Sequence, residues 1–97
     1  MKASAKIIIL KLQQPLAQLP ALATELGSFE TVIRIPDSVF VVRTNLTVNE
    51  VCASLSALIG ERGSVFVGSV SAPCKLHGSD VSLNQVMALV SQPTEVG

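Results

Sequence analysis

The chain alternates between short runs of β-branched and aliphatic residues and longer segments in which hydrophobic residues recur every three or four positions. The first pattern is typical of strands, and the second is typical of helices that bury one side. Strands are therefore expected at Ala5–Leu12, Phe29–Ile35, Val39–Thr44 and Ser64–Val70. The first of these is apolar at every position from Ile7 to Leu10, as in a strand that is buried on both faces.

A helix is predicted most clearly over Val48–Ile59. Thr47 and Glu50 form a T-x-x-E capping box at its start, and Gly60 follows its last turn. One side of this helix is apolar, whereas the opposite side carries no charged residue. The residues on that uncharged side are Asn49, Ala53, Ser54, Ser56 and Ala57. A solvent-facing helix side normally carries charges, so this neutral side favours self-association, for which the open sheet face or the C-terminal segment is the expected contact.

Two further helices are expected. The earlier one begins near Pro20, whose missing N–H costs little in a first turn, and Gly27 is placed as its C′ residue. The later one follows a second capping box made by Ser82 and Gln85, and this box predicts a short helix over Leu83–Ser91.

The order up to residue 71 is strand-helix-strand-strand-helix-strand. This split arrangement predicts an α+β fold of the ferredoxin-like type, with two helices on one face of an antiparallel sheet. A length of 97 residues suits a single domain, 1–97, with a core at about 5–71 and a C-terminal extension at 72–97. The extension is expected to form either the short helix or a strand, which could lie at the sheet edge near Lys75–His77 or be swapped. Either the extension or a second copy of the chain must cover the other sheet face.

Composition adds an expectation about partners. Hydrophobic residues make up 48% of the chain and charged residues 14%, against about 25% charged in an average soluble domain. So little charge favours burial against a second copy, and we expect a homodimer, with a further protein partner left open. Acidic and basic residues balance at seven each, so nucleic-acid binding has little support. No segment is long enough for a membrane span or a secretory signal, which predicts a cytoplasmic protein without membrane contact.

Few residues are candidates for chemistry. Cys52 falls on the apolar side of the capped helix, where a small buried residue is expected, and Cys74 lies in a loop. The one histidine, His77, has no second ligand near it in the sequence and is expected at the surface. The sequence contains no nucleotide-binding, metal-binding or nucleophile motif. It therefore predicts no cofactor, no metal and no catalytic residue, and it favours a non-enzymatic function.

The segment from Asp37 to Thr47 combines an acidic residue and a serine, an aromatic-aliphatic strand and the start of a capped helix. Together with Ser64–Gly68, it resembles the small SinR-like proteins. These are relatives of the CRISPR-associated adaptation protein with a ferredoxin-like fold and of VapD-type toxins. The resemblance covers about residues 5–71 and implies the same fold. In nuclease members of that group, aspartates at the ends of two first strands meet across a dimer and hold a divalent metal.

Lys11 stands where the resemblance would place that aspartate. Lysine cannot coordinate Mg²⁺, which takes carboxylate and water oxygens, so the metal-nuclease mechanism is not expected. Lys11 could instead form an ion pair with Asp37, worth about 0–1 kcal/mol if partly exposed. Arg34 and Arg43 lie on strands joined by a turn, and they are either solvated or flank one patch for an anion or RNA. These four residues are the candidate partner or anion contacts.

Two functional hypotheses follow from the sequence. The preferred one is a non-catalytic, homodimeric interaction module on a ferredoxin-like scaffold. The alternative is a degenerate or metal-dependent nuclease of a toxin–antitoxin or CRISPR-related family. A small-molecule regulatory domain is a third and weaker hypothesis.

Overall fold

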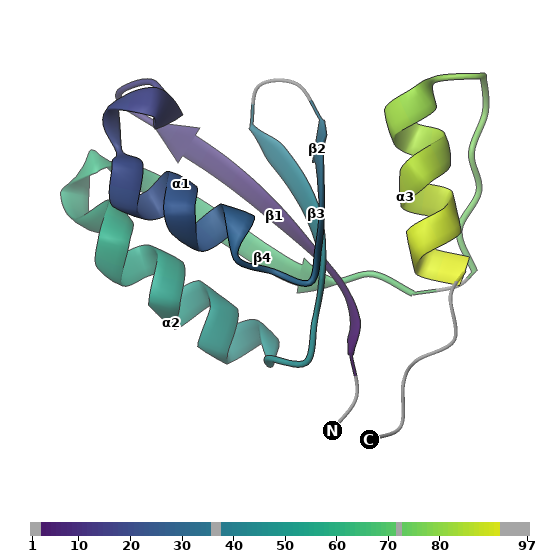
Figure 1. Cartoon of the computed structure of the whole chain (residues 1–97), viewed down its shortest axis with the longest axis horizontal. Coiled ribbons are helices and arrows are strands. Elements are labelled where there is room, and N and C mark those ends of the chain that lie inside the picture. Colours follow the sequence, from purple (N-terminus) through teal and green to yellow (C-terminus); the bar gives the residue numbers. More distant parts are fainter. Residues whose placement is uncertain (1–2, 36–37, 72, 92–97) are drawn as a thin grey trace.

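The computed structural model describes residues 3–35, 38–71 and 73–91. A four-stranded sheet lies between two helical layers, with α1 and α2 on one side and α3 on the other (Figure 1). The strands are β1 (Ser4–Leu12), β2 (Thr31–Ile35), β3 (Val39–Thr44) and β4 (Gly63–Ser69). The helices are α1 (Pro20–Gly27), α2 (Val48–Ile59) and α3 (Val81–Ser91), and short 3-10 helices span Leu16–Gln18 and Gly60–Arg62.

The strands lie in the order β2-β3-β1-β4, and every neighbouring pair is antiparallel. The expected α+β class with an antiparallel sheet is therefore confirmed. All four expected strands are present, with small differences at their ends. The largest difference is at β2, which begins at Thr31 rather than Phe29, since the Phe29 side chain packs against the hydrophobic core instead of continuing the strand.

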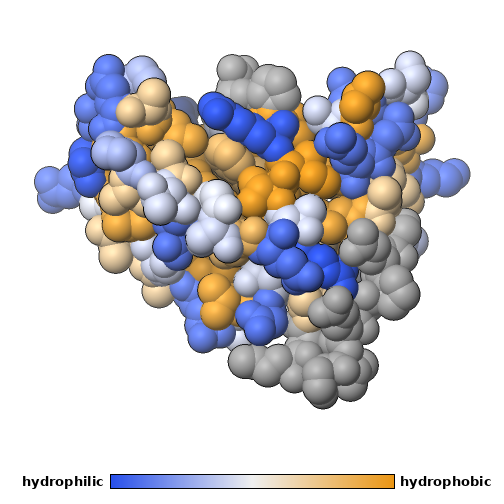
Figure 2. Space-filling view, in the orientation of Figure 1, coloured by the Kyte–Doolittle hydropathy of each residue, from blue (hydrophilic) through white to orange (hydrophobic). Residues whose placement is uncertain are grey.

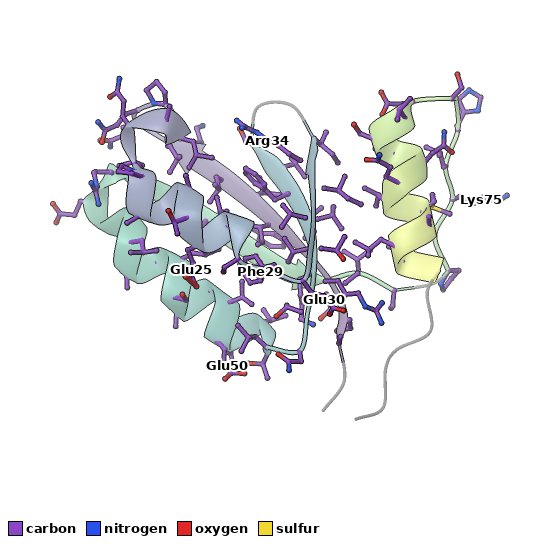
Figure 3. All side chains as sticks on the ribbon, in the orientation of Figure 1. Glu25, Phe29, Glu30, Arg34, Glu50 and Lys75 are labelled. Carbon is purple, nitrogen blue, oxygen red and sulfur yellow. The ribbon has the colours of Figure 1, made fainter. Side chains whose placement is uncertain are left out.

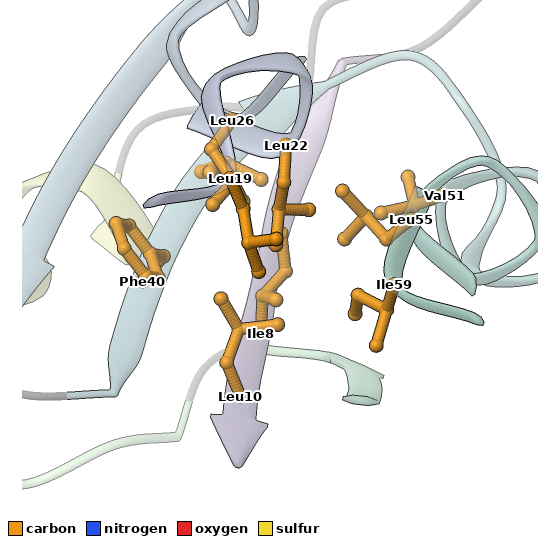
Figure 4. Packing of buried hydrophobic residues seen from close by; sticks show 10 residues of the cluster. Ile8, Leu10, Leu19, Leu22, Leu26, Phe40, Val51, Leu55 and Ile59 are labelled. Atoms are coloured by element: carbon orange, nitrogen blue, oxygen red, sulfur yellow. The ribbon is translucent and has the colours of Figure 1, made fainter. Parts of the chain in front are cut away.

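The main core lies between α1, α2 and the sheet face that we call the inner face. The even-numbered residues of β1, β2 and β3 and the odd-numbered residues of β4 point to this face, where they meet the apolar sides of both helices (Figure 4). The buried members are Ile8, Leu10, Leu19, Leu22, Leu26, Phe40, Val42, Val51, Leu55 and Ile59. The odd-numbered residues of β1, β2 and β3 form the opposite surface, the outer face.

Helix α2 has the ends that the sequence predicts. The Thr47 hydroxyl accepts a hydrogen bond from the Glu50 N–H at 3.1 Å, and the Glu50 carboxylate accepts one from the Thr47 N–H at 2.9 Å. At the other end Gly60 takes a φ of 57°, a left-handed conformation that favours glycine. The Arg62 guanidinium donates to the carbonyls of Leu58 and Ile59, which the helix itself leaves unpaired.

Helix α1 starts as expected and ends differently. Pro20 occupies its first turn. The prediction that Gly27 is the C′ residue is wrong, because Gly27 is the last helical residue and Ser28 is the C-cap in a right-handed conformation. Both the N–H and the hydroxyl of Ser28 donate to the Glu25 carbonyl. Ser28 thus supplies the hydrogen bonds that end the helix, and no left-handed glycine is required.

The C-terminal extension forms helix α3, and the alternative of a strand near Lys75–His77 is wrong. The expected capping box of Ser82 and Gln85 is also wrong. The helix begins at Val81, because the Asp80 carboxylate accepts a hydrogen bond from the Leu83 N–H at 3.0 Å. Asp80 is a strong N-cap residue that lies two positions earlier than Ser82, so it sets the start of the helix.

Helix α3 packs on the outer face. Its residues Val86 and Leu89 contact a second cluster that contains Ile33 and Val41, with Ile7 and Ile35 partly buried beside them. The sequence predicts that the C-terminal extension or a second copy must cover this face. Helix α3 of the extension covers it over β2, β3 and part of β1. The described part of the chain shows no comparable contact of α3 with β4.

Replacing Thr47 by alanine should lower the free energy of unfolding by about 0.5–2 kcal/mol, because the Glu50 N–H loses its acceptor at the start of α2. Urea unfolding at one fixed protein concentration measures this change. The Thr47→Ser variant keeps the hydroxyl and should unfold close to the wild-type midpoint. Equal loss in both variants would show that the cap hydrogen bond does not stabilise the helix.

Candidate functional site

The structure separates the residues that the sequence placed in one patch. Arg34 is opposite Phe40 in the pairing of β2 with β3, and therefore lies on the inner-face side. Arg43 is opposite Thr31 and Ala5, lies on the outer face and is buried. The prediction that Arg34 and Arg43 flank one patch is therefore wrong, because they are on opposite faces of the sheet.

Lys11 is exposed on the outer-face side of β1, opposite Ser64 of β4. Ala5, which is opposite Arg43, lies six positions away on the same strand, or about 20 Å at the usual rise per residue. Lys11 and Arg43 therefore do not form one anion site. Asp37, the predicted partner of Lys11, lies outside the described residues, and the ion pair stays a prediction.

Arg34 borders an open cleft of about 440 Å³ where β1 ends. Its guanidinium carbon lies 5.5 Å from the centre of the Phe40 ring, a cation–π contact worth about 0.5–1 kcal/mol at an exposed site. Figure 3 shows the Arg34 side chain at the end of β2. Gln13, Gln14 and Ser38 add polar groups to the same cleft. A guanidinium beside amides and a hydroxyl can hold a carboxylate or a phosphate, so an anion contact stays a prediction for Arg34, as a separate contact does for the exposed Lys11.

Lys6 is a buried cation that the sequence did not single out. It lies on the inner face opposite Val42 and Ser69, with 6% of its surface exposed. Its ammonium donates a hydrogen bond to the Ser4 hydroxyl at 2.5 Å. Because burial disfavours the charged form, the pKa of Lys6 is lowered from its ordinary value. The only signal in the sequence is a lysine directly before an isoleucine run.

The outer face ends in an apolar patch beside β4. Ile9 pairs with Val39 on one side and with Phe66 on the other, so these three side chains form one row across the sheet. The exposed fraction is 40% for Ile9 and 61% for Phe66. The Phe66 ring leans along β4 over Gly68, where a Cβ would lie 3.3 Å from it. Figure 2 views the molecule from the opposite side, where further hydrophobic surface lies between the two helical layers.

Strand β4 is also a free edge of the sheet. Its residues are Gly, Ser, Val, Phe, Val, Gly and Ser, so it carries no charge from Gly63 to Ser69. It lies close against β1, since a Cβ at Gly63 would overlap the carbonyl oxygen of Lys11. From its type, a phenylalanine within an apolar strand such as Phe66 is expected in the core. The missed signal is the alternation of side chains along β4. Val65 and Val67 point to the inner face, so Phe66 between them points to the outer face.

The remaining candidates for chemistry are dispersed. Within residues 3–35, 38–71 and 73–91, no group of three or more His, Cys, Asp or Glu residues could hold a metal ion. Cys52 is half-buried with its sulfur 3.8 Å from the Ser56 hydroxyl, and the Cys74 thiol donates to the Ser71 carbonyl. The helices of the described segments are all too short or too polar to cross a membrane.

Comparison of the chain with protein-family models, with curated proteins and with solved structures finds no match. The relationship to SinR-like and VapD-type proteins stays a prediction, as does the nuclease alternative that it implies.

Burial of Lys6 makes stability depend on pH. Since the pKa of Lys6 is lower in the folded state than in the unfolded state, the folded chain releases this proton first, and stability rises with pH between the two pKa values. We expect the Lys6→Met variant to be more stable than wild type at neutral pH, with the difference shrinking as pH approaches 10.5. Urea unfolding between pH 7 and pH 10.5 measures it.

The matched control is Lys11→Met, which removes the same charge from an exposed position. If both variants change stability equally at every pH, burial of Lys6 is not the cause.

Proposed function

We propose that the chain is a non-catalytic interaction module on a ferredoxin-like scaffold, and that it functions as a homodimer. The strand order β2-β3-β1-β4, with a helix after β1 and another after β3, is the arrangement expected of a ferredoxin-like sandwich. This scaffold supports many functions, so the functional argument rests on the surface of the sheet rather than on the fold.

The observation that carries the proposal is the exposed pair of Phe66 and Ile9. A phenylalanine ring with 61% of its surface exposed lies beside a 40% exposed isoleucine in the same cross-strand row. Covering apolar surface contributes about 25 cal/mol for each Å² removed from water. Large aromatic residues also carry much of the binding energy at the centres of protein interfaces.

The character of the patch favours a second copy as its partner. The neighbouring positions of β4, Ser64 and Gly68, are small and uncharged. Two copies related by a two-fold axis bring the same surface against itself, so like charges at the contact would repel. A patch centred on Phe66 has no such charge on β4, and the whole chain is formally neutral. Strand β4 therefore brings no like charges into a contact of the patch with its own copy, and the nearest charge on this face is Lys11 of β1, opposite Ser64.

Light scattering coupled to size exclusion tests the proposal. Wild-type protein should elute as a dimer at micromolar concentration, and Phe66→Glu should raise the dissociation constant by more than about 30-fold, since a central aromatic residue contributes about 2 kcal/mol or more. Val81→Glu is the matched control, because Val81 is a 71% exposed apolar residue at the start of α3, away from β4.

A wild-type monomer at these concentrations would refute the dimer. An equal effect of both substitutions would show that the contact does not involve the patch at Phe66.

A further inference from the structure

The two edges of the sheet differ in their protection. Exposed edge strands are usually blocked by charged residues, proline or bulges, because their free N–H and C=O groups can pair with another chain. The β2 edge carries Arg34 and follows Glu30, both of them exposed. The β4 edge carries no charge and no proline. It also pairs with β1 residue for residue, from Lys6 with Ser69 to Leu12 with Gly63, so it contains no bulge.

The hydrogen-bonding direction of each β4 residue follows from the contacts at its two ends. Just beyond β4, the Val70 N–H donates to the Ala5 carbonyl at 3.1 Å. Just before it, the Gln13 N–H donates to the Arg62 carbonyl at 2.8 Å. Even-numbered residues along this strand therefore use their backbone groups toward β1. Because the direction alternates along an antiparallel strand, the N–H and C=O groups of Val65 and Val67 point outward.

We infer that β4 of one copy pairs antiparallel with β4 of a second copy about a two-fold axis at Phe66, which joins two four-stranded sheets into one of eight strands. This inference rests on the proposed homodimer and specifies its geometry. In this register Val65 faces Val67 of the second copy, and the two residues exchange both of their backbone hydrogen bonds. The two Phe66 residues lie opposite each other as a non-hydrogen-bonded pair, in which side chains approach most closely.

The length of the strand selects this register. An axis at Phe66, the middle residue, pairs the whole of Gly63–Ser69 with its copy. An axis at Val65 or Val67 would leave the last residues of each strand without a partner. An axis between two residues would place an outward-pointing residue opposite an inward-pointing one, and the hydrogen bonds could not form.

Helix α2 provides independent support. The Ser54 hydroxyl donates to the Glu25 carboxylate of α1, so this side of α2 faces α1. Residues two positions away on a helix lie on nearly the opposite side, which places Cys52 and Ser56 on the side directed beyond the β4 edge. Both residues are small and uncharged. In a continuous sheet the α2 helices of the two copies lie next to each other, and small neutral residues permit their close approach.

Paired cysteine variants test the register. Ser64 of one copy would be opposite Gly68 of the other, with Cα atoms about 4.5 Å apart, a separation compatible with a disulfide. The Ser64→Cys and Gly68→Cys variants are prepared in a Cys52→Ala, Cys74→Ala background and mixed under mild oxidation. A disulfide-linked dimer should form in the mixture. Ser64→Cys alone should not link, since its two copies would be about 14 Å apart.

The outcomes separate the register from the proposed function. A dimer by light scattering without a link in the mixture would overturn β4 pairing and leave the homodimer intact. A wild-type protein that is monomeric by light scattering would refute both the β4 pairing and the homodimer. A Cβ at Gly68 requires the Phe66 ring to shift, so Phe66→Cys is the second variant. It should link to itself in this register, and a folded dimer of Phe66→Cys that does not link would also overturn it.

Discussion

Strand β1 is apolar on both faces, and the remaining elements are arranged around that constraint. It lies between β3 and β4, with Ile8 and Leu10 pointing to the inner face and Ile7 and Ile9 to the outer face. A strand of this kind is stable only where both sheet faces are covered. Helices α1 and α2 cover the centre of the inner face, since Ile8 is fully buried and Leu10 nearly so. The outer face has only α3, and this helix extends as far as Ile7.

The incomplete cover on the outer face and the free edge of β4 meet at the same place. Ile9 is the apolar residue of β1 that α3 leaves exposed, and Phe66 is its partner on β4. One contact with another chain could therefore satisfy both the apolar side chains and the unpaired backbone groups. The side chains provide affinity through burial, whereas the backbone groups impose direction and register. A contact on the face alone would leave the backbone groups of Val65 and Val67 to water.

The sequence predicts the ends of a helix well where it offers a single strong capping residue at each end. The capping box of Thr47 and Glu50 predicts both bounds of α2 correctly together with Gly60. At α3 two N-cap candidates compete, and Asp80 forms the cap rather than Ser82 because its carboxylate reaches the Leu83 N–H. At α1 the hydroxyl of Ser28 donates a hydrogen bond to the Glu25 carbonyl that a glycine cannot make. These differences arise from side-chain geometry that spacing does not specify.

The site was harder to predict, because it depends on register. Arg34 and Arg43 lie on adjacent strands, which suggested that they share a patch. Successive residues of a strand point to opposite faces, however, and the observed pairing of β2 with β3 places the two arginines on different faces. The same alternation places the Phe66 side chain on the exposed outer face and the Lys6 side chain on the buried inner face. Register is fixed by turns and by packing between distant segments, and neither is visible in the composition of one strand. Hydrophobic content therefore predicts association with another chain, while the position of the exposed apolar patch follows only from the paired sheet.

An unprotected edge strand normally carries a risk of open-ended aggregation, and in the proposed dimer the difference between the two edges would limit this risk. Antiparallel pairing of β4 with a second β4 consumes both unprotected edges at once. The sheet that results ends in two β2 strands, each with Arg34 along it and Glu30 just before it. Charged residues on an edge oppose the addition of a further strand, since pairing would desolvate them and align like charges. Association through β4 would therefore stop at two copies, so the absence of charge on one edge and its presence on the other would together define a closed dimer.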